Sequence, residues 1–207
     1  MTCDKIERLE KDTENNGKRV KLIMKTILEK VKQSRQLVSL YKPNDQDQFN
    51  MGYVLELKEN EMIVFNINSE DRINSGSYLW TEADRICRIH AEGQDEKRSI
   101  ERMKRYQGEK LSRKIDGFHL KAGDGESLQM AFLRYAKEND KFVECAVNDD
   151  TRVGIVMDIT DSLLVLKEID YYGKEDGISY ILLSSIQEIY IDGKASRKAE
   201  YLYHNQK

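Results

Sequence analysis

Few residues of this chain are placed to do chemistry. The three histidines, His90, His119 and His204, have no second histidine or cysteine at the short spacing that zinc ligands show. Carboxylate pairs occur at Asp149-Asp150 and Glu175-Asp176, in polar stretches typical of solvated turns. We therefore expect no metal, no cofactor and no enzymatic activity, and we assign no catalytic residue.

The cysteines and the N-terminus indicate a reducing compartment. Cys3, Cys87 and Cys145 form an odd, scattered set, which argues against a disulfide framework. Cys87 and Cys145 lie in apolar stretches, so we expect both to be buried as small hydrophobic residues. The first ten residues alternate in charge, unlike a secretory signal, and no apolar run approaches the roughly 18 residues of a membrane span. We expect a cytoplasmic protein without membrane contact.

One basic run is a candidate RNA contact. Lysine and arginine neutralise phosphates, and an aromatic ring can stack on a base. The candidate contact residues are Arg102, Lys104, Arg105, Tyr106, Lys110, Arg113 and Lys114. The alternative is a solvated helix that rests on acidic parts of the protein. The sequence leaves both interpretations open.

Charge alternates along the chain, whose formal net charge is −3. Residues 1–36 and residues 88–121 each carry ten Lys and Arg against six Asp and Glu. Residues 37–87 carry four against nine, and residues 122–207 carry ten against sixteen. A nucleic acid would therefore have to meet the two basic parts.

The sequence repeats itself at an offset of 102. Gly52-Tyr-Val-Leu-Glu-Leu57 aligns with Gly154-Ile-Val-Met-Asp-Ile159, and both alternate apolar and polar residues. At the same offset Ser77-Tyr-Leu-Trp80 aligns with Ser179-Tyr-Ile-Leu182. Each copy follows a segment with helical apolar spacing, whose residues are Ile23, Ile27 and Val31 in the first copy and Leu128, Phe132 and Ala136 in the second. We infer an internal duplication.

Each copy predicts a helix followed by five short strands. The expected strands cover residues 37–41, 51–58, 62–68, 77–82 and 85–91, then 142–147, 153–160, 163–170, 178–183 and 186–192. Five strands leave two open edges, which closure removes. We therefore expect each copy to close into a barrel capped by its helix.

The predicted organisation has five parts. They are an N-terminal segment (1–17), a first helix plus barrel (18–93), a charged helix and linker (94–125), a second helix plus barrel (126–193) and a tail (194–207). We expect one solvated helix over 94–114 and a linker over 115–127. Asp124 or Ser127 is the expected N-cap of the second copy's helix.

The pattern resembles the Sm-like family, whose members include bacterial RNA-binding proteins. The clearest segment is Val153-Gly-Ile-Val-Met-Asp-Ile-Thr-Asp-Ser-Leu-Leu-Val-Leu166, continuing to Ile186 and Ile189. The resemblance implies a mainly β fold with helices, built from two helix-capped, five-stranded Sm-like (SH3-like) barrels packed as a pseudo-two-fold pair. Asp161 can stand for the family's base-binding aspartate, but the partnering asparagine and the basic pair are absent.

Two non-enzymatic functions follow as predictions. The first is an RNA-binding module that uses the basic run, as the resemblance implies. The second is a protein-interaction scaffold without nucleic-acid binding, whose partner is another protein or a second copy of the chain. The acidic barrels and the missing base-contacting residues favour the second function, and the Sm-like pattern favours the first.

Overall fold

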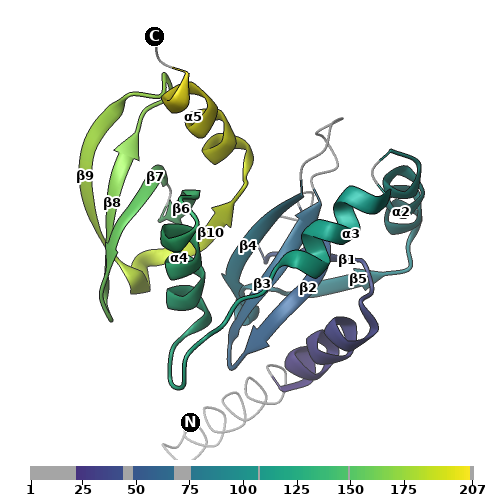
Figure 1. Cartoon of the computed structure of the whole chain (residues 1–207). Coiled ribbons are helices and arrows are strands. Elements are labelled where there is room, and N and C mark those ends of the chain that lie inside the picture. The colour runs from purple at the N-terminus through teal and green to yellow at the C-terminus, as the bar shows by residue number, and fades with distance from the viewer. Residues whose placement is uncertain (1–21, 44–48, 68–75, 107, 149, 206–207) are drawn as a thin grey trace, which may run out of the picture.

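A single antiparallel sheet joins both halves of the protein. The computed structural model describes residues 22–43, 49–67, 76–106, 108–148 and 150–205. Its ten strands follow the order β5-β1-β2-β3-β4-β10-β6-β7-β8-β9, and every neighbouring pair is antiparallel (Figure 1). Among the described residues no helix is long and apolar enough to cross a membrane.

The first unit begins with a helix whose described part covers residues 22–34, called here the N-terminal helix. Five strands, one short 3-10 helix and one α-helix follow: β1 (Val38–Tyr41), β2 (Phe49–Lys58), β3 (Glu61–Ile67), β4 (Gly76–Glu82), η1 (Ala83–Arg85), β5 (Arg88–Ala91) and α2 (Gln94–Tyr106). Helix α3 (Gly108–Gly117) then leads to the second unit.

The second unit repeats this succession. It consists of α4 (Leu128–Glu138), β6 (Phe142–Val147), β7 (Asp150–Ile159), β8 (Leu163–Ile169), β9 (Glu175–Leu182), η2 (Leu183–Ser185), β10 (Ile186–Ile191) and α5 (Lys194–His204). The Ser127 hydroxyl, one of the two expected N-caps, accepts a hydrogen bond from the Met130 N–H at the start of α4.

Small irregularities recur at equivalent places in the two units. The register of β2 shifts between Val54 and Glu56, and that of β7 shifts at the equivalent Val156 and Asp158. An ion pair joins helix to strand beside each shift, at 2.6 Å for Lys32–Glu56 and 3.0 Å for Lys137–Asp158. Since such irregularities are not required by alternation alone, their recurrence supports the inferred duplication.

The expected closure of each unit into a separate barrel is wrong, because the sheet is open and runs continuously through both units. Strand β4 pairs with β10 of the second unit, which places Trp80 opposite Ile189 and Tyr78 opposite Ile191. A strand has only two hydrogen-bonding edges. With β3 on one edge and β10 on the other, β4 has no edge left to close its own unit against β5.

The pairing also corrects the predicted alignment of β4 with β9. Ile63 lies opposite Trp80, and its equivalent Val165 lies opposite Tyr180. Trp80 therefore corresponds to Tyr180 rather than to Leu182, and the same shift makes Tyr78 equivalent to Ile178. The reason is a shorter connection between β8 and β9 than between β3 and β4.

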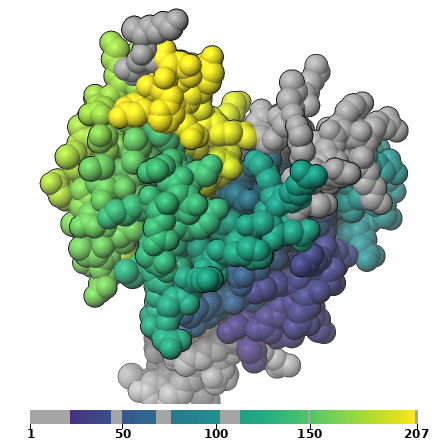
Figure 2. Space-filling model, in the orientation of Figure 1, coloured from purple at the N-terminus to yellow at the C-terminus, as the bar shows by residue number. Residues whose placement is uncertain are grey.

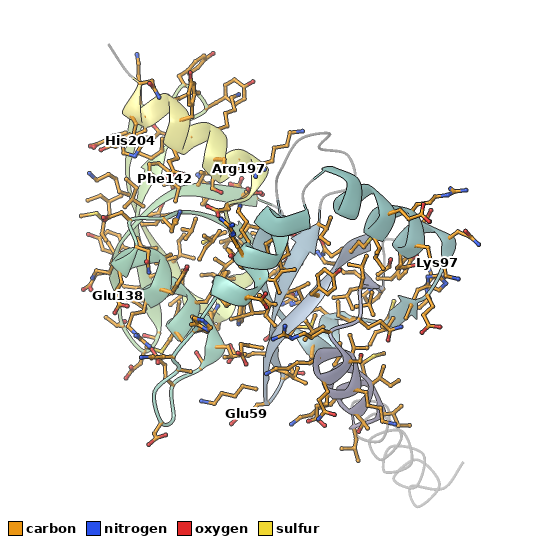
Figure 3. All side chains as sticks on the ribbon, turned by 45° about the vertical axis from the view of Figure 1, so that its right-hand side comes forward. Glu59, Lys97, Glu138, Phe142, Arg197 and His204 are labelled. Atoms are coloured by element: carbon orange, nitrogen blue, oxygen red, sulfur yellow. The ribbon has the colours of Figure 1, made fainter. Side chains whose placement is uncertain are left out.

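Two helical regions differ from the expectation. The single helix expected over residues 94–114 is two helices, α2 and α3. The segment predicted as a tail contains α5, which packs on β6: the rings of Phe142 and His204, labelled in Figure 3, have centroids 6.0 Å apart.

The two faces of β3 and β4 belong to different cores. Met62, Val64 and Leu79 pack with the N-terminal helix inside the first unit. Ile63 and Trp80 point to the opposite face and pack with α4 and the core of the second unit. The first unit is therefore buried on both faces of these strands.

Candidate protein-interaction surface

The second unit covers one face of β3 and β4 in the first unit. Phe118, directly after α3, stacks on the ring of Tyr78 with centroids 4.4 Å apart. The Glu61 carboxylate accepts the indole N–H of Trp80 at 3.1 Å and the backbone N–H of Leu128 at 2.6 Å. A helix thus begins directly on this face, while β10 pairs with its edge.

The equivalent face of β8 and β9 is open. Ile178, Tyr180 and Leu182 alternate along β9 on one side, and each is more than half exposed. Met157, at the irregularity in β7, is exposed as well. We call Met157, Ile178, Tyr180 and Leu182 the β9 surface.

The outer edge of β9 is also open. Among the described strands, β9 pairs only with β8, so one edge retains its backbone donors and acceptors for another strand. Figure 2 shows the yellow-green strands of the second unit forming the left flank of the molecule. An apolar face beside an unpaired edge is a docking or aggregation site in water. This arrangement suits binding of a protein that brings its own strand.

The basic run lies on α2 and α3. The side chains of Arg102, Lys104, Arg105, Tyr106 and Lys110 lie outside the described residues. Arg113 is exposed on α3. The Lys114 ammonium lies 3.7 Å from Asp192, and the Lys114 carbonyl accepts the Tyr78 hydroxyl at 2.9 Å. Lys114 therefore links α3 to both units.

Among the residues that the structure describes, the histidines and cysteines form no group of three or more potential metal ligands, alone or with carboxylates. His90 bonds Glu96 through Nδ1 at 3.1 Å. Burial raises the pKa of the Cys145 thiol to about 12, with Glu144 adding to the effect, so this thiol stays protonated. The expected burial of Cys87 is wrong: it lies in the exposed connection before β5, with its thiol 3.4 Å from the Tyr41 carbonyl.

A serine and a glutamate exchange places between the units. In the first unit the Ser39 hydroxyl on β1 donates to the Glu96 carboxylate on α2. In the second, Glu144 stands at the place of Ser39 and Ser196 at the place of Glu96. Burial raises the pKa of Glu144, against hydrogen bonds from the backbone of Ala195 and Ser196. Burial alone would raise the pKa of Glu96, but hydrogen bonds from Ser39, its own backbone and His90 lower it.

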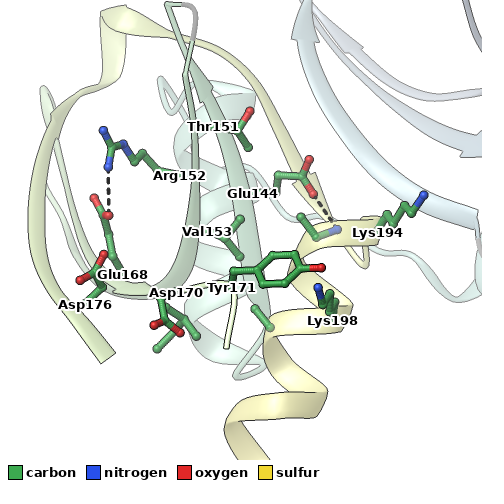
Figure 4. Close-up of a pocket in the computed structure, with 13 residues that line it drawn as sticks. Glu144, Thr151, Arg152, Val153, Glu168, Asp170, Tyr171, Asp176, Lys194 and Lys198 are labelled. Atoms are coloured by element: carbon green, nitrogen blue, oxygen red, sulfur yellow. Dashed lines mark hydrogen bonds and ion pairs between the residues drawn. The ribbon is translucent and has the colours of Figure 1, made fainter. Parts of the chain in front are cut away.

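A pocket of about 650 Å³ lies between α5 and strands β6 to β8 (Figure 4). Several of its charged groups have a partner in the structure. Arg152 contacts Glu168 at 3.2 Å, Glu144 accepts the Ala195 N–H at 3.2 Å, and the Lys198 ammonium lies 2.9 Å from the centre of the Tyr171 ring. In this lining Arg152 and Glu168 form a pair of opposite charges, whereas Glu144 and Lys198 contact a backbone N–H and an aromatic ring.

Comparison with known proteins gives no relative. No family model matches the chain, and no curated protein or solved structure matches it significantly. The Sm-like resemblance stays a prediction.

The β9 surface was missed in the sequence, although a signal was present. Residues 178–183 are all apolar except Ser179, so an extended strand here would place apolar side chains on both of its faces. Such a run is typical of a strand buried on both faces. Strand β9 is instead an edge strand with one face open, and this mismatch marks the surface.

Proposed function

We propose that this chain is a non-enzymatic protein-interaction scaffold and that a partner protein docks on the β9 surface. The observation that carries the proposal lies within the molecule: the equivalent face of the first unit is covered by α4 and extended by β10. A partner for the β9 surface would supply the same two elements, an apolar helix and an antiparallel strand. Strand addition gives affinity through main-chain hydrogen bonds and specificity through alternate side chains.

RNA binding through the basic run is the alternative, supported by the ten basic residues of the 88–121 segment and by the exposure of Arg113. It differs from scaffold binding in its response to salt. Contacts with phosphates weaken steeply as salt rises, whereas an apolar interface between proteins responds little.

Purification of the full chain without nuclease, followed by native mass spectrometry, tests the proposal. We expect protein complexes free of nucleic acid that are lost in the double variant Tyr180→Asp/Leu182→Asp. Tyr201→Asp is the matched control, because Tyr201 is equally exposed on α5 but lies outside the β9 surface. This control should keep the complexes.

Two results would overturn the scaffold proposal. One is that complexes survive unchanged in the double variant. The other is that nucleic acid co-purifies, with a raised ratio of absorbance at 260 to 280 nm, and is lost when Arg102, Lys104, Arg105, Lys110, Arg113 and Lys114 are replaced by glutamine. That second result would establish the RNA-binding alternative.

A further inference from the structure

The β9 surface has a complementary counterpart on the same molecule. Resting on the proposed function, we propose that its partner is a second copy of this chain, which docks its N-terminal helix and its β5 strand there. Copies would then associate head to tail, with the β9 surface of one against the N-terminal helix of the next.

The N-terminal helix exposes the face that α4 buries. Ile23 and Ile27 are exposed, whereas their equivalents Leu128 and Phe132 are buried in the core that α4 shares with Trp80 and Tyr78. Leu22 adds a third exposed apolar residue to this end of the helix. We call Leu22, Ile23 and Ile27 the helix surface.

The free edge of β5 is equivalent to the edge of β10 that pairs with β4. Strand β5 pairs only with β1 among the described strands, whereas β10 pairs with both β6 and β4. Transferring the internal register places Ile89 of one copy opposite Tyr180 of the next. It also places Ala91 opposite Ile178. The ten-stranded sheet would thus continue from molecule to molecule.

The positions and charges of the two surfaces suit this arrangement. The N-terminal helix and β5 lie on one side of the molecule and β9 on the other (Figures 1 and 2). Residues 1–36 carry an excess of four positive charges, and residues 122–207 carry an excess of six negative charges. Such complementarity steers association and disfavours contact between two identical β9 surfaces.

Head-to-tail association also accounts for most of the exposed apolar residues. Ten large hydrophobic residues are exposed in the described chain, and seven of them form the β9 surface and the helix surface. Pairing of two β9 edges would cover the first group and leave the helix surface in water. A single head-to-tail contact covers both.

Sedimentation velocity on the full chain and two double variants tests the proposal. Tyr180→Asp/Leu182→Asp removes the β9 surface, and Ile23→Asp/Ile27→Asp removes the helix surface. We expect the parent to exceed the 24.2 kDa of one chain and each variant alone to sediment as a single chain. Mixed in equal amounts, the variants should form a two-chain complex, because each retains the surface that the other lacks.

The other outcomes contradict the inference in different ways. If the helix variant keeps the parent's mass while the β9 variant does not, two β9 edges pair back to back. If the parent is a single chain at all concentrations, the second copy is not the partner. The scaffold proposal would still stand in that case, provided that complexes with another protein depend on Tyr180 and Leu182. Tyr201→Asp should behave as the parent throughout.

A disulfide test checks the register without relying on loss of binding. In a Cys3→Ser/Cys87→Ser background, chains carrying Ala91→Cys and chains carrying Ile178→Cys are mixed and oxidised. Directly opposite residues in an antiparallel pair are within disulfide reach. We expect a linkage between positions 91 and 178, and none when Tyr201→Cys replaces Ile178→Cys. A linkage between two Ile178→Cys chains, or equal linkage with Tyr201→Cys, would overturn the inferred register and the head-to-tail contact.

Discussion

Strands β4 and β9 occupy the same place in the two units but have different surroundings. Trp80 on β4 is 2% exposed, and its equivalent Tyr180 on β9 is 69% exposed. Both are large aromatic residues, so residue type does not explain the difference. The chain supplies β10 and α4 to β4 and, within its described residues, supplies no equivalent neighbour to β9. Whether this aromatic residue is buried therefore depends on the position of its unit in the duplicated chain. The second unit is left with an apolar face on β9 that no described element covers.

Truncation of the two equivalent aromatic residues, Trp80 and Tyr180, should give the largest difference in unfolding free energy between the two units. Trp80→Ala leaves a cavity between the units and should cost about 3–5 kcal/mol of unfolding free energy. Tyr180→Ala removes an exposed side chain and should change stability by no more than about 0.5 kcal/mol in the dilute single chain. Thermal unfolding at low protein concentration measures both, and equal losses would contradict the described difference in burial.

Substitution of the equivalent glycines, Gly52 and Gly154, should lower the unfolding free energy by similar amounts in the two units. A Cβ at Gly52 would lie 2.3 Å from the Phe65 carbonyl oxygen, and one at Gly154 would lie 2.0 Å from the Lys167 carbonyl oxygen. Backbone must move in both units, so Gly52→Ala and Gly154→Ala should each cost about 1–3 kcal/mol. Urea unfolding provides the measurement. A loss in only one unit would mean that the duplication does not extend to this backbone contact.

The serine–glutamate exchange predicts opposite, smaller effects of pH. The pKa of Glu96 is lowered on folding, so its carboxylate stabilises the protein at neutral pH and this contribution is lost as pH falls below the ordinary value of 4.5. The pKa of Glu144 is raised, so its ionisation opposes folding at neutral pH and the penalty disappears on acidification through its raised pKa.

Glutamine variants test these signs. Glu96→Gln should be less stable than the parent at pH 7 by about 1 kcal/mol, and the gap should close below pH 4.5. Glu144→Gln keeps an amide oxygen that can accept from α5, so at pH 7 it should match or exceed the parent. Urea unfolding between pH 3 and pH 8 gives both curves. Losses of the same sign and pH dependence would show that the two glutamates are equivalent.

The local alternation of apolar and polar residues predicted the strands, but it did not predict which strands pair at the edge of each unit. Alternation after Gly52 and Gly154 is a short-range property, and the predicted strands lie close to the observed ones. The pairing of Trp80 with Ile189 joins residues more than a hundred positions apart, and alternation carries no information about such an edge. Helix α5 was missed because Lys194–His204 is mostly polar and small, and its few apolar contacts arise only on packing against β6.

The candidate site was predicted less well than the fold. Sequence reasoning placed function on the basic run, because charge clusters are visible without any structure. The β9 surface is recognised when Tyr180 is compared with the buried Trp80, and the alignment that matched Trp80 with Leu182 concealed that equivalence. The correct equivalence required the register of both hairpins, which depends on the lengths of their connections.

A chain that contains the same unit twice can fold by joining the wrong halves, and the exchanged serine and glutamate bear on this error. If α5 docked on β1, Ser196 would meet Ser39, and Ser39 would lose the Glu96 carboxylate to which its hydroxyl donates. If α2 docked on β6, Glu96 would meet Glu144, and two carboxylates would share one poorly solvated site. Both mispaired forms are penalised, and only the native assignment of helix to strand pairs each glutamate with donors. Two residues in each unit thus favour docking of each helix on the strand of its own half of the chain.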